Sequence, residues 1–179
     1  MSKLTKHQKD FVYQQACRIA LSQHPLETLT SGSACLYWMH AGLIAMRNAG
    51  VKAIPACGTA RFQMRSPEGH DDPTHLSFHW NDTSGEGKPM AAPVEGIPLP
   101  EMHCFMYISE TNEVADFSVR YLPVFAKKIG YKFEPQFVPP NYYWERPDVL
   151  HPIAMYIPNL DATKLAMSVL KLEKILCHT

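Results

Sequence analysis

Apolar residues recur at helical spacing in two stretches near the start of the chain. In residues 3–23 they return every three or four positions, and His24-Pro25 ends the pattern. Residues 34–48 form a second helical pattern that is apolar on nearly all sides, closed by Gly50 as a C-terminal cap. A helix of this kind is buried on most sides, and its small residues permit close approach to a sheet.

The middle of the chain carries the patterns of β-strands. Residues 109–112 have the composition of a turn, so we expect the strands on either side of them to pair as a hairpin. The ranges predicted as strands are 51–64, 74–80, 102–108 and 113–119.

The remaining segments set the fold class. Residues 81–100 are rich in Gly and Pro and predict a long loop, which in a compact domain is often a lid or binding loop. Residues 121–158 carry many prolines and aromatics and predict no regular element. Residues 160–176 predict a final helix capped by Asn159 or Asp161. The order of helices, strands and helix predicts an α+β fold with a mainly antiparallel sheet in a single domain, 1–179.

Composition excludes several classes of protein. The 17 Lys and Arg balance the 17 Asp and Glu, so no general field draws the chain to nucleic acid or an anionic membrane surface. No window contains the roughly 18 uninterrupted apolar residues of a membrane span, and the first twenty residues lack a secretory signal pattern. Five scattered cysteines do not form a disulfide framework and predict reduced thiols in the cytoplasm.

Cys35 is the cysteine best placed for chemistry. A catalytic cysteine must be a thiolate, and Cys35 falls in the first turn of the second predicted helix, whether Ser31 or Ser33 is the cap. Unpaired backbone N–H groups and the positive end of the helix dipole favour negative charge there. The alternative is that Cys35 is simply a buried, inert residue, since free cysteines are among the most buried residue types.

The later hairpin supplies candidate partners for this thiol. A thiolate nucleophile needs an imidazole as base and acid, and a third group to orient that imidazole. His103 opens an apolar strand, and Asp116 is the only charged residue within the return strand 114–119. A buried carboxylate needs a partner, although Asp116 could also face solvent.

Register is the difficulty with this pairing. The simplest turn, centred on Thr111-Asn112, would set His103 opposite Arg120 and leave Asp116 roughly 13 Å along the strand. A longer or shifted turn, or a bulge, must therefore close the gap.

Two segments resemble the transglutaminase-like superfamily. The run SACLYWMHAGLIAMRNAGVKAIPACG is similar to its nucleophile helix and first core strand, and MHCFMYISETNEVADFSV to its His and Asp strands. The likeness covers about residues 30–120, with 121–179 as a C-terminal extension. It implies a cysteine-proteinase-like fold in which Cys35 is the nucleophile, His103 the base and Asp116 the orienting acid.

The other cysteines are ranked below Cys35. Cys104 directly follows His103 in a strand, so its side chain leaves the opposite face and we expect it not to share the site. Cys57, near the bend expected at Gly58, and Cys177 are interpreted as structural or incidental. Cys17 lies on the flank of the first helix and is interpreted as packing.

Two weaker patterns concern metal and substrate. His75 and His79 lie four apart on a predicted strand, about 13 Å, too far to share an ion. Solvated loop residues are therefore the preferred interpretation of the polar cluster that they form with His70, Asp71 and Asp72.

Aromatic residues are frequent in the C-terminal third and could wall a substrate groove, although plain packing is equally compatible with them. The residues considered are Tyr121, Phe125, Tyr142, Tyr143 and Trp144, with Trp38 from the second helix; of these, Trp38, Tyr143 and Trp144 are predicted to bind substrate.

The sequence therefore predicts a thiol-dependent acyl-group enzyme, a peptidase or amidase-type hydrolase or an acyltransferase. Its substrate would be peptide-like, or a small amide or ester, and no cofactor or metal is expected. One alternative is a non-catalytic binding domain that retains the fold. A third is a metal-dependent enzyme that uses the His70 to His79 region.

Overall fold

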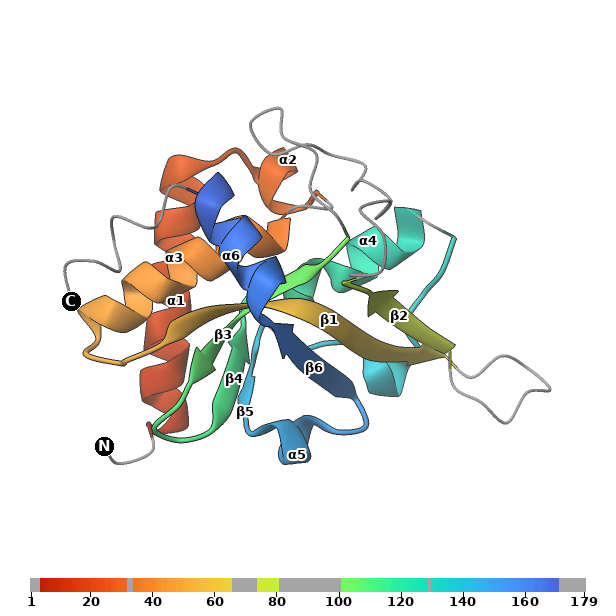
Figure 1. Ribbon diagram of the computed structural model, residues 1–179. Helices are drawn as coiled ribbons and strands as arrows, with labels where there is room; N and C mark the ends of the chain where they lie inside the picture. The colour runs from red at the N-terminus through yellow and green to blue at the C-terminus, as the bar shows by residue number, and fades with distance from the viewer. Residues whose placement is uncertain (1–3, 32–33, 66–73, 81–100, 129, 171–179) are drawn as a thin grey trace.

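A six-stranded sheet organises the computed structural model, which describes residues 4–31, 34–65, 74–80, 101–128 and 130–170 (Figure 1). All of its paired strands run antiparallel, in the order β2-β1-β3-β4-β5, with β6 paired to β1. The strands are β1 (Ile54–Arg65), β2 (Thr74–Phe78), β3 (His103–Ile108), β4 (Glu113–Asp116), β5 (Tyr143–Glu145) and β6 (Ala154–Asn159).

Helices pack on both sides of this sheet, so the predicted α+β class with a mainly antiparallel sheet is confirmed (Figure 1). One core lies between the sheet and α1, α3 and α6, and a second lies on the opposite face, under α4. The helices are α1 (Lys6–Gln23), α2 (Leu26–Leu29), α3 (Ala34–Asn48), α4 (Leu122–Lys128), α5 (Pro147–Leu150) and α6 (Leu160–Val169), with short 3-10 turns η1 (Val119–Tyr121) and η2 (Pro135–Phe137). None of the described helices is long and apolar enough to cross a membrane.

Capping residues determine where helices α1 and α6 begin. α1 begins at Lys6 rather than at residue 3 because Thr5 and Gln8 form a capping box, in which the Gln8 N–H donates to Thr5 Oγ1 at 3.3 Å and the Thr5 N–H to Gln8 Oε1 at 2.9 Å. Asn159, one of the two predicted caps, accepts from the N–H groups of Asp161 and Ala162 at the start of α6.

Close packing of α3 on β3 fixes where the start of α3 lies. A Cβ on Gly42 would overlap the sulfur of Met106 in β3 and crowd the ring of Phe117. The helix can approach the sheet this closely only because residue 42 lacks a side chain. Cys35, two turns earlier, is thereby held beside the first residues of β3.

Side-chain alternation divides β3 between the two cores. Cys104 and Met106 face the core that contains α3, while Phe105 belongs to the core on the other side. The His103 ring contacts Phe62 and Phe78, which belong to that second core. The hairpin of β3 and β4 therefore contributes to both sides of the sheet.

The structure departs from the predicted elements after Asp116. β4 ends there rather than at residue 119, and the chain turns at Ser118 into η1. The stretch 121–158, for which no element was predicted, contains β5 and most of β6. The predicted loop 81–100 and residues 171–176 of the last predicted helix lie outside the described residues.

A buried ion pair ties α1 to the β3–β4 hairpin. The Lys9 ammonium lies 2.8 Å from Glu113 Oε1 and donates to the Trp144 carbonyl oxygen, also at 2.8 Å. The side chains of Lys9 and Glu113 are only 6% and 4% exposed. Each charge therefore offsets much of the solvation that the other loses on folding, with Glu145, 3.7 Å from the ammonium, and the Thr111 hydroxyl, 2.7 Å from Glu113 Oε2, adding to this.

Replacing Lys9 by Met should destabilise the fold, because it leaves the Glu113 carboxylate buried without its cation. We expect the free energy of unfolding to fall by about 3–5 kcal/mol in urea titrations followed by circular dichroism. Lys164→Met is the matched control, since the ion pair of Lys164 with Asp161 is largely exposed and should contribute little. Equal losses in the two variants would contradict the structural role assigned to Lys9.

Candidate functional site

Cys35 is the second residue of α3, within its first turn, as the sequence predicted. The segment leading into the helix is fixed by two hydrogen bonds: the Ala34 N–H donates to the Ser31 carbonyl at 3.1 Å, and Trp38 Nε1 donates to the Leu29 carbonyl at 3.0 Å. The Cys35 thiol is buried and sits at the positive end of the helix dipole.

The register of the β3–β4 hairpin brings His103 and Asp116 together. Ile108 pairs with Glu113, and the ladder continues to Met106 and Ala115. Extended by three residues, this register sets His103 opposite Ser118, two positions from Asp116. The pairing register is thus shifted by two residues from that of the simplest turn, and side chains diagonal to each other on one face come within reach.

The resulting contact is short and enclosed. His103 Nε2 lies 2.6 Å from Asp116 Oδ2, and both residues are 1% exposed. The four-residue connection 109–112 accommodates this register with Asn112 in the left-handed region, at φ 53°. The expected gap of roughly 13 Å is closed by the shifted turn, without a bulge in this hairpin.

Asp116 accepts hydrogen bonds on both of its oxygens. Oδ1 accepts from the Ser118 N–H at 2.9 Å and from the Ser118 hydroxyl at 2.7 Å, while Oδ2 also accepts from the Tyr156 hydroxyl at 2.9 Å. Burial alone would raise the pKa of Asp116. The His103 imidazole and the Ser118 donors outweigh burial and hold that pKa below its ordinary value, so the carboxylate stays ionised.

The His103 imidazole is charged at neutral pH in this environment. Burial disfavours its charged form, but the Asp116 carboxylate and, to a smaller extent, Cys35 outweigh burial and raise the pKa of His103 to about 10. The ring lies between Phe62 and Phe78, with centroid distances of 5.3 and 5.1 Å. Because water is excluded there, the pairing with Asp116 dominates.

The two ring nitrogens have different roles. Nε2 donates to Asp116, which leaves Nδ1 for the thiol. Nδ1 is buried and has no hydrogen bond of regular geometry among the described residues. Cys35 is nevertheless close enough to interact with the imidazole, and the interaction raises the pKa of His103 and lowers that of Cys35. Nδ1 is thus the nitrogen available to exchange a proton with the sulfur.

The pKa of the Cys35 thiol lies well below its ordinary value. Hydrogen bonding from Cys104 is the largest cause, burial opposes it, and the His103 imidazolium adds to the lowering. The same hydrogen bond and burial raise the pKa of Cys104, which stays a neutral donor. Cys35 is therefore the thiolate of the pair.

The prediction that Cys104 would stay away from the site is wrong. Its side chain does leave β3 on the face opposite to His103, as strand alternation requires. That face is the one that α3 covers, however, so Cys104 meets Cys35 from behind. Cys57, interpreted from sequence as structural or incidental, lies next to Cys104, with a sulfur–sulfur distance of 3.1 Å.

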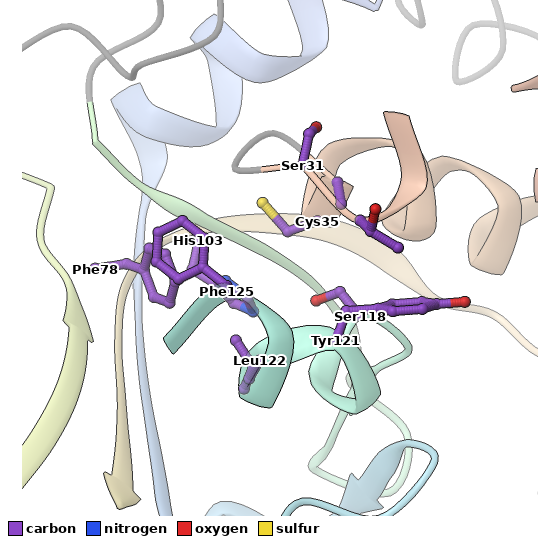
Figure 2. A pocket seen from close by; sticks show the side chains of 10 residues that line it. Ser31, Cys35, Phe78, His103, Ser118, Tyr121, Leu122 and Phe125 are labelled. Atoms are coloured by element: carbon purple, nitrogen blue, oxygen red, sulfur yellow. The ribbon is translucent and has the colours of Figure 1, made fainter. Parts of the chain in front are cut away.

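A pocket opens beside Cys35 and His103 (Figure 2). Tyr121 and Phe125, two of the aromatics predicted to wall a groove, contribute to it. Its lining combines apolar side chains with hydroxyl groups, which come from the segment before α3, from the residue before η1 and from η1 itself. The lining residues are Thr30, Ser31, Ala34, Cys35, Phe78, His103, Ser118, Tyr121, Leu122 and Phe125.

The three residues predicted to bind substrate do not line this pocket, because each belongs to a packed core. Trp38 is buried behind Tyr121, on which it stacks with a centroid distance of 5.4 Å. Tyr143 pairs with Asp116 across the β4–β5 ladder, and Trp144 packs under the Lys9 ammonium. All three are less than one-tenth exposed.

The histidines considered for metal binding lie apart from this pocket's lining. His75 is exposed on β2 and His79 follows that strand, also exposed, while His70, Asp71 and Asp72 lie outside the described residues. Within 4–31, 34–65, 74–80, 101–128 and 130–170, no three His, Cys, Asp or Glu side chains are grouped to hold a metal ion.

Comparisons with known proteins inform the fold alone. No protein-family model matches the chain, and no curated protein matches it. The structure is similar to a structural-genomics crystal structure with a TM-score of 0.55 and 14% sequence identity, over 96% of this chain and 74% of that one. That likeness concerns the arrangement of helices and strands.

Asp116→Asn should lower the pKa of His103 by about 1–3 units, because the neutral amide no longer stabilises the imidazolium. The check is an NMR titration of the histidine ring carbons in both proteins, in which the wild-type ring stays protonated to about pH 10. Asp148→Asn, on the exposed pair with Arg146, should leave the titration unchanged. An unshifted pKa in Asp116→Asn would contradict the pairing.

The same raised pKa makes stability depend on pH. Because the folded pKa of His103 exceeds the ordinary value of about 6.5, its contribution is complete below pH 6.5 and is lost as pH rises through about 10. Urea midpoints measured between pH 6 and 10 should fall less in Asp116→Asn than in the wild type.

Proposed function

We propose that this protein is a thiol-dependent acyl-group enzyme on a transglutaminase-like domain. The observation that carries the proposal is the buried hydrogen bond between His103 and Asp116 in a site that also holds Cys35 at the start of a helix. Thiolate, imidazolium and carboxylate are the three groups that nucleophilic thiol catalysis requires. Hydrolysis of a peptide-like amide bond is the first choice of reaction.

The proposed reaction follows from the charges of the three groups. The Cys35 thiolate attacks the carbonyl carbon, and the oxygen becomes an oxyanion that the Cys35 backbone N–H stabilises at the helix start. His103 Nδ1 gives its proton to the leaving nitrogen or oxygen, which departs and leaves a thioester on Cys35. His103 then takes a proton from water or an amine, which attacks the thioester and frees the thiolate.

Asp116 serves as the positioning residue in this scheme. Its hydrogen bond holds the imidazole so that Nδ1 faces the sulfur, and its charge stabilises the imidazolium between the two proton transfers. Ser118 and Tyr156 in turn fix the carboxylate. These contacts leave the His103 ring little freedom to rotate, which is what a proton shuttle between two partners needs.

The transglutaminase-like assignment rests on chain order and placement. A helix that begins at the thiol is followed by the histidine strand and the carboxylate strand, in the order Cys35, His103, Asp116. We place the enzyme in the cytoplasm because an odd number of scattered cysteines suits a reducing compartment.

Iodoacetamide at pH 6 should alkylate Cys35 in preference to Cys17. A thiol of pKa about 8.5 is only about 0.3% thiolate at that pH, whereas the hydrogen bond from Cys104 and the His103 imidazolium together hold the pKa of Cys35 well below its ordinary value. His103→Ala should abolish the preference, and His7→Ala, which removes an exposed histidine of α1, should preserve it. Peptide mass spectrometry gives the site and rate. Labelling of Cys35 no faster than that of Cys17 would favour a non-catalytic binding domain, consistent with its burial.

A p-nitrophenyl ester should transfer its acyl group to Cys35. We expect a burst of nitrophenol with one acyl adduct per chain, because formation of the thioester splits the reaction into two steps. Cys35→Ser should lower the rate by about a thousandfold or more, and His103→Ala by a similar factor. Cys17→Ser is the control and should retain the burst. An adduct on any other residue, or none, would overturn the proposed function.

A further inference from the structure

Three cysteine sulfurs form a continuous chain that leads from the pocket into the core. Cys35 lines the pocket, and Cys104 hydrogen-bonds it from behind. Cys57 lies 3.1 Å from Cys104, sulfur to sulfur, and 3.9 Å from the sulfur of Met39. The acyl chemistry proposed above uses only the first of these thiols as a nucleophile.

Cys57 and Cys104 have the geometry of a disulfide precursor. They are directly opposite each other on β1 and β3. Directly opposed residues of antiparallel strands have Cα atoms about 4.5–5.5 Å apart, which lies within the range that disulfides span. The two sulfurs need to approach by only about 1 Å to bond, so side-chain rotation suffices.

The three thiols differ in their access to the pocket and in their ionisation, and therefore in how readily an oxidant reacts with them. Cys35 meets the pocket and is the thiolate, whereas Cys57 and Cys104 are 0% and 3% exposed and lie between α3 and the sheet. An oxidant that enters the pocket therefore reaches Cys35 first. A thiolate in that position oxidises to a sulfenic acid, and a neighbouring thiol can capture it before it is oxidised irreversibly.

We propose that Cys104 and Cys57 form a resolving dithiol that reduces peroxide-oxidised Cys35 and regenerates the nucleophile. The inference rests on the reactive Cys35 of the proposed function but not on its acyl chemistry. The oxidant is a peroxide, and the product is a Cys57–Cys104 disulfide with Cys35 returned to its thiolate form.

The first step consumes the peroxide. The Cys35 sulfur attacks one peroxide oxygen, the O–O bond breaks, and the leaving hydroxide takes the proton of the His103 imidazolium to become water. Cys35 is then a sulfenic acid, two electrons oxidised, and His103 is neutral. The imidazole that serves acyl transfer thus also supplies the proton for this step.

Two exchanges at sulfur complete the cycle. The Cys104 sulfur attacks the Cys35 sulfur, the S–O bond breaks, and hydroxide leaves with the Cys104 proton as a second water. Cys57 then attacks the Cys104 sulfur, Cys35 departs as a thiolate, and the Cys57 proton passes to His103. The sum is two thiols and one peroxide converted to one disulfide and two waters.

The disulfide would also alter the site. Cys104 without its proton can no longer donate a hydrogen bond to Cys35, and that bond is the largest cause of the lowered pKa of Cys35. The oxidised protein should therefore keep an intact nucleophile with a higher pKa and slower acyl transfer at pH 6. Reduction of the disulfide by a dithiol would restore the original rate.

The test is disulfide mapping of the full-length protein. Reduced protein receives a small molar excess of hydrogen peroxide at pH 7, is denatured with N-ethylmaleimide, and is digested for mass spectrometry. We expect a Cys57–Cys104 disulfide with Cys35 alkylated. Cys35→Ser should lose that disulfide, and the matched control Cys17→Ser should form it at the wild-type rate. Cys104→Ser should accumulate sulfinic acid on Cys35.

Several outcomes would overturn the relay. These are a Cys57–Cys104 disulfide that forms equally fast in Cys35→Ser, a Cys35–Cys104 disulfide as the end product, and sulfinic Cys35 beside alkylated Cys57 and Cys104. If Cys104→Ser does not fold, the disulfide map of the wild-type protein still shows whether the relay operates. The ester assay on reduced protein separates the two proposals. An acyl adduct on Cys35 in that assay, with no Cys57–Cys104 disulfide after peroxide, rejects only the relay. A Cys57–Cys104 disulfide after peroxide, with no acyl adduct on Cys35, rejects only acyl transfer.

Discussion

The pairing of a buried imidazolium with a buried carboxylate is the constraint on which the site depends. His103 and Asp116 are each almost fully enclosed, and neither could carry charge there alone. Two oppositely charged groups 2.6 Å apart, with additional donors on the carboxylate, make the enclosure tolerable. The donors come from separate parts of the chain, Ser118 just after β4 and Tyr156 in β6, so the pair is stabilised only in the completed sheet.

The charged pair influences Cys35 at the end of strand β3. His103 lies at the first position of β3 and lines the same pocket as Cys35, with which it interacts. Cys104, on the other face of the same strand, reaches the thiol from behind. A strand end that meets a helix start can thus present two successive residues, from opposite faces, to one sulfur. Interior strand positions could not do so, because the sheet would separate their side chains.

Local patterns were sufficient to predict the elements that carry the three groups. The range of α3 was predicted to the residue, because its apolar stretch is bounded by turn residues and Gly50. Asp116 was identified as a lone carboxylate among apolar neighbours. The register of the hairpin was not predictable, since it depends on a positive φ at Asn112 rather than on strand patterning. Asp116 forms an Asx turn with the N–H of Ser118, and an Asp at the end of a predicted strand is a signal that sequence reasoning could have used.

The long-range contacts of the site could not be predicted from the sequence. Tyr156 contributes to the site because β6 returns to pair with β1, and the proline-rich stretch before it hides that strand. Trp38 and Trp144 are buried and do not line the pocket beside Cys35, since large aromatics fill cores as readily as grooves, and sequence alone does not distinguish the two. For Cys104 the expected face was correct, but the side that α3 covers was not known.

The four-residue connection 109–112 has a consequence for divergence. Because successive strand residues alternate between faces, inserting or deleting one residue there would rotate every β4 side chain to the other side of the sheet. Asp116 would then enter the α3 core, and Ala115 or Phe117 would be turned toward the imidazole. Descendants of this chain need a residue that tolerates positive φ at position 112, such as Asn or Gly, and the length of the turn is limited to changes that preserve parity.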